Sequence, residues 1–148
     1  MKTIEQAIQS RFRNNRHKAI VNLLYTAKYM ESLIEKIIKP YDLSQQQFNI
    51  LRIVRGASAK PLTLKYIKER MLDQMPDASR VVEKLCKKEL LKRTTCDADR
   101  RSVDISITQK GLDLLAELDT HSEKMDALMQ LSDNQLEQFN TLLDSIRN

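Results

Sequence analysis

Apolar residues recur along most of this chain at the spacing of an amphipathic helix. Between residues 4 and 39 they lie three or four positions apart, which predicts one or two long helices ending at Pro40. The clearest stripe there is Ile20, Leu23, Leu24, Ala27, Met30, Ile34 and Ile37. The capping pair Ser44 and Gln47 then opens a further helix, with Gly56 as its expected C-terminal cap. The stripe of that helix is Phe48, Leu51 and Val54.

The next segment predicts two short helices joined by a brief turn. Thr63 is the expected N-cap of the first, and Pro76 fits the first turn of the second, which should span about 76–89. The inward-facing positions of the second helix would be Ala78, Val82 and Leu85. Its outer face would carry Arg80, Glu83, Lys84 and Lys87. Two short helices with a basic outer face on the second are typical of a helix-turn-helix.

A β-hairpin, or wing, is expected directly afterwards, over about residues 90–108. Its second strand alternates apolar and polar residues, with Val103, Ile105 and Ile107 on one face. The tip carries Arg100 and Arg101, and a narrow minor groove of DNA concentrates the negative potential that attracts arginine. Asp97 and Asp99 are expected to pair with an arginine and hold the shape of the tip, the alternative being a solvated surface loop.

The last part of the chain returns to helical spacing. Thr108 is expected to cap a long helix from Gln109, and Ser132 with Gln135 should open a final one. Their stripes are Leu112, Leu115, Leu118, Met125 and Met129, then Leu136, Phe139, Leu143 and Ile146. The small middle module cannot cover the amphipathic helices at both ends of the chain, so a second subunit in a C2 dimer is the economical partner.

The expected fold is therefore mainly α with a small two-stranded β wing. We divide the chain into N-terminal dimerisation helices (1–40), a winged helix-turn-helix lobe that binds DNA (41–111) and C-terminal dimerisation helices (109–148). Few breakers and many Leu, Lys, Glu and Gln residues agree with a high helix content.

Charge is distributed unevenly along the chain, whose net charge is +5. Residues 1–59 hold ten Lys and Arg against four Asp and Glu, residues 60–101 hold twelve against seven, and residues 102–148 hold three against nine. A basic middle and an acidic last part indicate one surface that meets an anionic partner and another kept away from it. Ordinary scatter of solvated charge is the alternative.

The composition argues against an enzyme. Two glycines exclude Gly-rich phosphate loops, and the chain has no nucleophile elbow or His/Asp pairing. With only two histidines, His17 and His121, neither a metal site nor a cofactor is expected. The N-terminus lacks the apolar core of a signal peptide and no apolar run would span a bilayer, so we expect a cytoplasmic protein without membrane contact.

The stretch from Asp99 to Gly111 resembles the wing signature of the MarR family of transcription regulators. That signature reads Asp, any residue, Arg, five residues, an aliphatic residue, Thr, two residues and Gly. The matching positions are Asp99, Arg101, Ile107, Thr108 and Gly111. The preceding run, Ser79 to Arg93, is similar to the recognition helix of the family and its exit into the wing.

The resemblance implies a homodimer whose first and last helices intertwine and whose two winged lobes bind a pseudo-palindromic double-stranded operator. Family members are most often repressors, and many release DNA on binding a small phenolic or lipophilic molecule, or on cysteine oxidation. A winged-helix module that binds DNA without sequence preference, or that binds proteins or acts architecturally, is the alternative.

The resemblance also assigns residues to the DNA contact. Arg80 would bind guanine and Ser79 a phosphate or a base, while Arg101 would be the wing arginine of the family, with Asp99 as its structural partner. Phosphate contacts would fall to Lys84, Lys87, Thr63 and Lys65. The family usually has glycine at the position of Glu89, where a left-handed cap costs a non-glycine residue about 1 kcal/mol, so the shape of that turn stays open.

A regulating signal is harder to place. A ligand pocket between the dimerisation helices and the winged lobe would have Arg16, His17, Tyr25 and Tyr66 as polar candidates, although a Tyr on an apolar stripe is usually core. Cys86 and Cys96 are candidates for redox sensing, since Lys87 and Lys88 could favour a thiolate, but we favour a buried structural Cys86 and an incidental Cys96.

Overall fold

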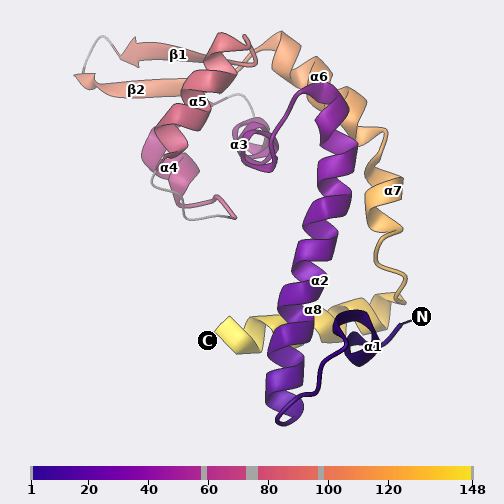
Figure 1. The fold of residues 1–148 in the computed structure, drawn as a ribbon. Coiled ribbons are helices and arrows are strands. Elements are labelled where there is room, and N and C mark those ends of the chain that lie inside the picture. The colour runs from indigo at the N-terminus through magenta and orange to yellow at the C-terminus, as the bar shows by residue number, and fades with distance from the viewer. Residues whose placement is uncertain (1, 58–59, 73–76, 97–98, 148) are drawn as a thin grey trace.

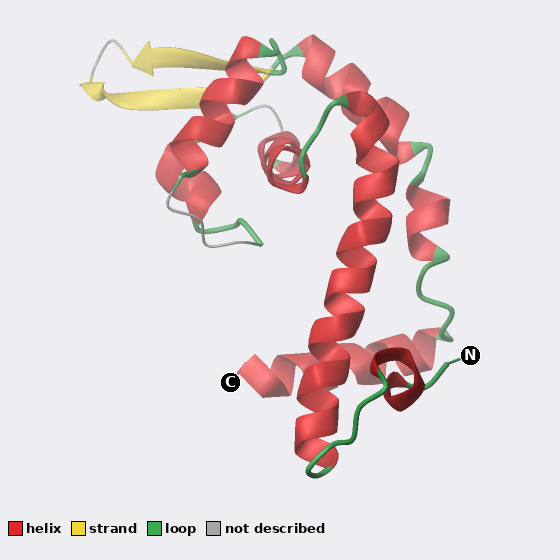
Figure 2. Cartoon of the chain, viewed as in Figure 1, coloured by secondary structure: helices red, strands yellow, loops and turns green. Residues whose placement is uncertain are grey.

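The chain forms a winged helix-turn-helix lobe with a long helical arm (Figures 1 and 2). The computed structural model describes residues 2–57, 60–72, 77–96 and 99–147, and for residues 95, 96 and 99–102 only the backbone. The lobe holds α3 (Gln45–Gly56), α4 (Leu64–Lys68), α5 (Ala78–Lys87), β1 (Leu91–Cys96), β2 (Asp99–Ile107) and α6 (Gln109–Asp119). The arm holds α1 (Ile4–Ile8), α2 (Asn15–Ile38), α7 (Ser122–Asp126) and α8 (Asp133–Arg147), and the short 3-10 turn η1 (Lys39–Tyr41) joins α2 to α3. The predicted fold class is confirmed.

Side-chain caps fix the starts of the helices as predicted. The Ser44 hydroxyl accepts from the backbone N–H of Gln47, whose side chain accepts from Ser44 in return. Thr63 caps α4 and Thr108 caps α6 through their hydroxyls. Each cap satisfies a backbone donor that the helix leaves without a partner, so these short helices begin at defined residues.

The hydrophobic core lies inside the lobe and is shared by all its elements. Its fully buried side chains include Ile50 and Leu51 of α3, Ile67 of α4, Val82 and Leu85 of α5, Leu91 and Ile105 of the hairpin, and Leu115 and Leu118 of α6. The predicted inward stripe of the recognition helix is therefore confirmed. Close packing of these residues fixes the orientation of α5 relative to α3 and the hairpin.

The arm has almost no buried residues within one chain. Of the 24 residues of α2 only Ile38 is buried, and α8 has none. Ile20 and Leu24 of α2 are 59% and 62% exposed, and Leu142 and Ile146 of α8 are 63% and 68% exposed. Large apolar side chains in contiguous exposed stripes indicate a surface that another molecule covers.

Two sequence predictions about helix ends are wrong. Gly56 is the last residue of α3 but lacks a positive φ, so it does not form a left-handed cap. The long helix predicted from Gln109 is interrupted, with α6 ending at Asp119 and α7 beginning at Ser122. At the break, the N–H groups of Thr120 and His121 bond three residues back, a tighter turn that stops the α-helix.

The hairpin is antiparallel and extended by one further contact. Leu91 lies opposite Ile107 and Arg93 opposite Ile105, with an irregularity between Thr95 and Cys96. Leu62, just before α4, exchanges two backbone hydrogen bonds of 2.8 Å with Ile105. The segment before the helix-turn-helix is thus tied directly to the wing.

The main chain at the start of the hairpin lies unusually close to the start of α6. Thr108 donates its backbone N–H to the Leu90 carbonyl at 3.1 Å, and its hydroxyl reaches the carbonyl oxygens of Leu90 and Glu89. A Cβ on Gly111 would lie 2.4 Å from the Leu90 carbonyl oxygen and 2.8 Å from a side-chain carbon of Ile107. Only glycine fits there without displacing backbone.

We expect Gly111→Ala to lower the free energy of unfolding by about 1–3 kcal/mol, because the new methyl group must displace the Leu90 main chain. Gly56→Ala is the matched control. A methyl group at Gly56 would have no atom within 4 Å, and the variant should gain about 0.5–1 kcal/mol from reduced backbone freedom. Urea unfolding at one fixed protein concentration measures both, and equal effects of the two substitutions would contradict the close-approach account.

Candidate nucleic-acid interface

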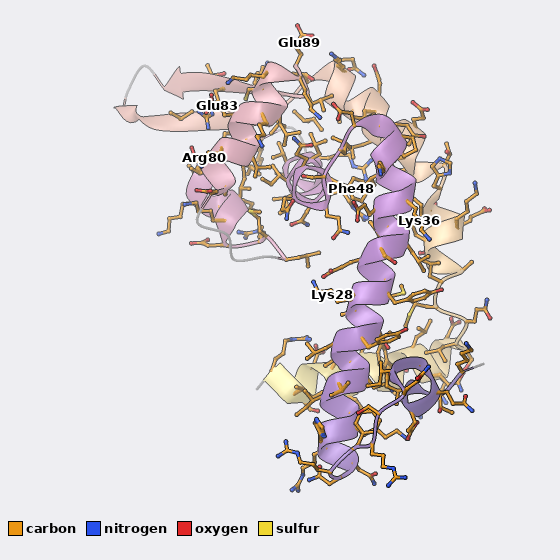
Figure 3. All side chains as sticks on the ribbon, viewed as in Figure 1. Lys28, Lys36, Phe48, Arg80, Glu83 and Glu89 are labelled. Atoms are coloured by element: carbon orange, nitrogen blue, oxygen red, sulfur yellow. The ribbon has the colours of Figure 1, made fainter. Side chains whose placement is uncertain are left out.

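Helix α5 presents a basic, solvent-exposed face from the lobe, opposite its buried stripe. Ser79, Arg80, Lys84 and Lys87 are all solvent-accessible, and the side chains of Arg80 and Lys87 are 79% and 75% accessible. Figure 3 shows Arg80 and Glu83 along α5 and Glu89 beyond its C-terminal end. The core therefore orients the predicted base-reading and phosphate-binding side chains together toward solvent.

The cations of this face are held only by weak local pairs. Arg80 lies 3.6 Å from Asp77, and Lys87 lies 3.0 Å from Glu83. The hydrogen bond from Lys87 lowers the pKa of Glu83, which is therefore ionised at neutral pH. Exposed pairs of this kind contribute about 0–1 kcal/mol, so a DNA phosphate or base can replace the carboxylate at little cost.

Arg93 of β1 supports the N-terminal end of α5, a contact that sequence reasoning missed. Its guanidinium donates to the backbone carbonyl of Ser79 at 3.2 Å. The strand alternation could have indicated this, because Arg93 shares a face with the buried Leu91. The hydrogen bond connects the wing directly to the first turn of the recognition helix.

The C-terminal end of α5 adopts the left-handed turn that glycine usually supplies. Glu89 has φ 61°, its N–H donates to Cys86, and the N–H of Leu90 donates to Leu85. These two bonds form a Schellman motif, with buried Leu85 and Leu90 as its hydrophobic contact. The turn thus keeps its usual shape despite the glutamate, and Glu89 also pairs with Lys110 at 3.1 Å.

Two further ion pairs, also missed from sequence, hold the lobe around α5. Lys88 lies 2.8 Å from a carboxylate oxygen of Asp42, which precedes α3 and itself has φ 54°. Arg55 at the end of α3 binds Asp119 at the end of α6 with two hydrogen bonds, of 2.5 and 3.2 Å. The second pair is bidentate, the geometry that gives an arginine–carboxylate contact its specificity.

The other predicted DNA contacts are placed less completely. The Thr63 hydroxyl accepts from the N–H of Tyr66 at 3.2 Å and so is engaged as the cap of α4, while the nearby Lys65 is exposed. Arg100 and Arg101 lie in β2 by their backbone, but their side chains and that of Asp99 are outside the described part, as is all of Asp97.

The four candidate ligand-pocket residues do not meet within one chain. Arg16 and His17 lie in the first turn of α2, and Tyr25 lies farther along this helix, which is about 36 Å long at 1.5 Å per residue. Tyr66 lies on α4, in the lobe at the other end of the molecule, and the Arg70 guanidinium stacks on its ring (Figure 1). A pocket that uses all four needs a partner subunit.

Cys86 is half-buried on α5, and burial raises the pKa of its thiol. The neutral thiol is thus favoured, contrary to the expectation that Lys87 and Lys88 promote a thiolate. The Cys96 side chain lies outside the described residues. Within the part of the chain that the structure describes, no three His, Cys, Asp or Glu side chains gather as metal ligands, and no helix is long and apolar enough to span a bilayer.

Comparisons with known proteins agree with this architecture. The MarR family model matches residues 43–103. The HTH-type transcriptional regulator MgrA of Staphylococcus aureus is 27% identical over 111 residues, covering 75% of this chain and 74% of MgrA. A MarR transcription factor from Planctomyces limnophilus superposes with a TM-score of 0.70 at 28% identity, covering 90% of this chain and 98% of that one.

A further similar structure concerns regulation by a small molecule. BpsR from Bordetella bronchiseptica, whose DNA binding is regulated by 6-hydroxynicotinic acid, superposes with a TM-score of 0.74 at 22% identity. The alignment covers 87% of this chain and 93% of BpsR. At this identity the likeness establishes a shared fold.

The left-handed turn at Glu89 yields a stability test. We expect Glu89→Gly to unfold with a free energy about 1 kcal/mol higher than that of Glu89→Ala, because only glycine adopts a positive φ without steric cost. Both variants lose the ion pair with Lys110. The difference between their unfolding free energies therefore reports the cost of the left-handed backbone conformation at residue 89. Urea unfolding measures it, and an Ala variant as stable as the Gly variant would show that the turn is not left-handed in solution.

Proposed function

This chain belongs to the MarR family of winged-helix transcriptional regulators, which are not enzymes; on that premise we propose that it acts as a homodimer on a pseudo-palindromic operator. Each subunit would place α5 in the major groove of one half-site. The two half-sites would lie one helical turn apart, about 34–36 Å, as the two-fold symmetry of such a dimer requires. The protein would act in the cytoplasm.

The observation that carries the proposal is the exposed basic face of α5, on a helix whose other face is packed into the core. Arg80 has the donor fork for guanine O6 and N7, and Ser79 beside it can bond a phosphate or a base. Lys84 and Lys87, one and two turns farther on, are suited to the phosphate backbone, as is Lys65 on α4. Thr63 would contribute through the helix start that its hydroxyl caps.

The wing would supply the second contact. Its strands are held to α5 by Arg93 and to the segment before α4 by the Leu62–Ile105 hydrogen bonds. The hairpin therefore extends in a direction set by the recognition helix. Arg100 and Arg101 near its tip would enter the adjacent minor groove, with Asp97 and Asp99 as their structural partners.

The dimer is supported by the exposed apolar stripes of the arm. Ile20 and Leu24 on α2, with Leu142 and Ile146 on α8, are more than half exposed in one chain. A second copy would cover both stripes across a two-fold axis, because each copy offers the same pair of surfaces. The arm also extends away from the DNA-facing lobe, so dimerisation and DNA binding would not compete (Figure 1).

We further propose that the protein is a repressor released by a small molecule, as DNA binding by the structurally similar BpsR is regulated by 6-hydroxynicotinic acid. The pocket would lie between the arms and the lobes of the dimer. Arg16, His17, Tyr25 and Tyr66 remain its proposed polar residues, brought together by the second subunit.

Substitution on α5 tests the division of roles along the recognition helix. We expect Arg80→Ala to weaken operator binding by about 1–3 kcal/mol and to relax the preference at one base position, because it removes a bidentate base contact. Lys84→Ala, which removes another exposed cation of α5, is the matched control. It should weaken all duplexes alike and reduce the slope of log K against log salt by about 1.

The measurement is selection from a random duplex library, followed by titration of the selected site at several salt concentrations. A loss for Arg80→Ala that is the same on every duplex would assign Arg80 to phosphate. If random duplex competes as well as the selected site for the unmodified protein, the basic face binds DNA without sequence preference and the operator proposal is wrong.

Charge placed on the exposed stripe of α8 tests the dimer. We expect Leu142→Glu to convert the protein to a monomer, because a buried unpaired carboxylate is incompatible with an apolar interface, while the lobe core stays intact. Asn140→Glu adds the same charge to the same helix, off this stripe, and should leave the dimer unchanged. Light scattering after size-exclusion chromatography measures the molar mass of both variants. A dimeric mass for Leu142→Glu would show that this stripe of α8 does not lie in the interface.

A further inference from the structure

A hollow of about 410 Å³ lies beside the wing, apart from the exposed face of α5. Five segments line it: the end of α3, the stretch before α4, the strands β1 and β2, and the start of α6. Its volume falls in the range of about 300–1,000 Å³ that is typical of small-molecule sites. None of the residues assigned above to DNA or ligand contact lines it.

Four of the five strand residues that line the hollow share one face of the hairpin, the exception being Ile107 at the end of β2. Lys92 lies opposite Ser106 and Thr94 opposite Asp104 in the antiparallel register, and all four line the hollow. The alternate residues point to the other face, where Arg93 bonds to α5. Most of the strand residues that line the hollow therefore face away from the side on which Arg93 contacts the recognition helix.

Cations dominate the charge of this hollow. Arg55, Lys60 and Lys92 line it against a single carboxylate, that of Asp104. Arg55 is held in place by its two hydrogen bonds to Asp119. Among the described residues, Lys60 and Lys92 have no carboxylate within ion-pair distance, so both ammonium groups are available to an anion.

The rest of the lining is suited to a compact apolar body. Val54 is only 1% exposed and lies at the boundary between the core and the hollow, and Pro61 and Leu112 add further apolar surface. The hydroxyls of Thr94 and Ser106 add two polar groups that can donate or accept hydrogen bonds. A mainly apolar wall with a few convergent polar groups is the usual chemistry of a small-molecule site.

We propose that this hollow binds a small molecule that carries a carboxylate or phosphate on a compact apolar body. The anion pairs with Lys60 and Lys92, the apolar part lies against Pro61 and Leu112, and Asp104 accepts from a hydroxyl or amino group of the ligand. A bound molecule would brace the hairpin against α3 and α6. An effect on operator affinity would rest on the function proposed above, but the binding itself does not.

Titration of the intact protein with 2-naphthoate, in the absence of DNA, tests the binding directly. We expect the largest amide chemical-shift changes at Lys60 and Leu62 and at residues 92–94 and 104–106. The neutral analogue 2-naphthalenemethanol should bind about tenfold more weakly, because it lacks the charge-assisted contacts to the lysines. Equal affinity for the two compounds, or shift changes that cluster elsewhere, would overturn the proposal.

Substitution of both lysines then tests whether they bind the carboxylate of the ligand. The double variant Lys60→Gln/Lys92→Gln should lose about tenfold in naphthoate affinity, whereas Lys84→Gln, which removes an exposed cation from α5, should lose none. An amide spectrum with the unmodified dispersion establishes that the double variant is folded. If the double variant binds naphthoate normally but binds DNA more weakly, the two lysines serve the phosphate backbone and the small-molecule site is refuted.

Discussion

Crowding around the main-chain carbonyl of Leu90 sets the geometry on which this molecule depends. Leu90 follows the left-handed turn at Glu89, begins the wing, and accepts hydrogen bonds from the backbone and side chain of Thr108 where the wing ends. Gly111 in the first turn of α6 comes so close that no Cβ fits. The end of the recognition helix, both ends of the wing and the start of α6 therefore meet at one point. This junction fixes the orientation of the wing relative to α5.

The arm obeys a different constraint, because most of its apolar stripes have no cover within one chain. The lobe has its own core, but Leu24 of α2 and Ile146 of α8 face solvent. Charge is divided along the sequence and not between lobe and arm, with the basic excess in residues 1–101 and the acidic excess in residues 102–148. A lobe that is complete in itself and an arm that is completed by a second copy would bring two DNA-reading surfaces to a defined spacing.

The sequence alone predicted the elements and the caps well, because these depend on local spacing and on side chains three residues away. Thr108 is an example, since its hydroxyl and the start of α6 are neighbours in the chain. Contacts between distant segments were not predictable in this way. Strand alternation places Arg93 on the inner face of the hairpin but does not identify Ser79 as its partner. Nothing local indicates that Gly111 is required by Leu90 rather than by its own helix. The break after Asp119 was missed for a related reason, because apolar spacing continues across it.

The central claim is that this basic winged helix recognises a particular DNA sequence as a dimer. Binding of the purified protein to the DNA flanking its own gene tests this most directly, at two salt concentrations and with excess random duplex as competitor. We expect protection that survives the competitor, weakens as salt rises and is two-fold symmetric, with centres one helical turn apart. Binding that random duplex abolishes, or protection without two-fold symmetry, would contradict it.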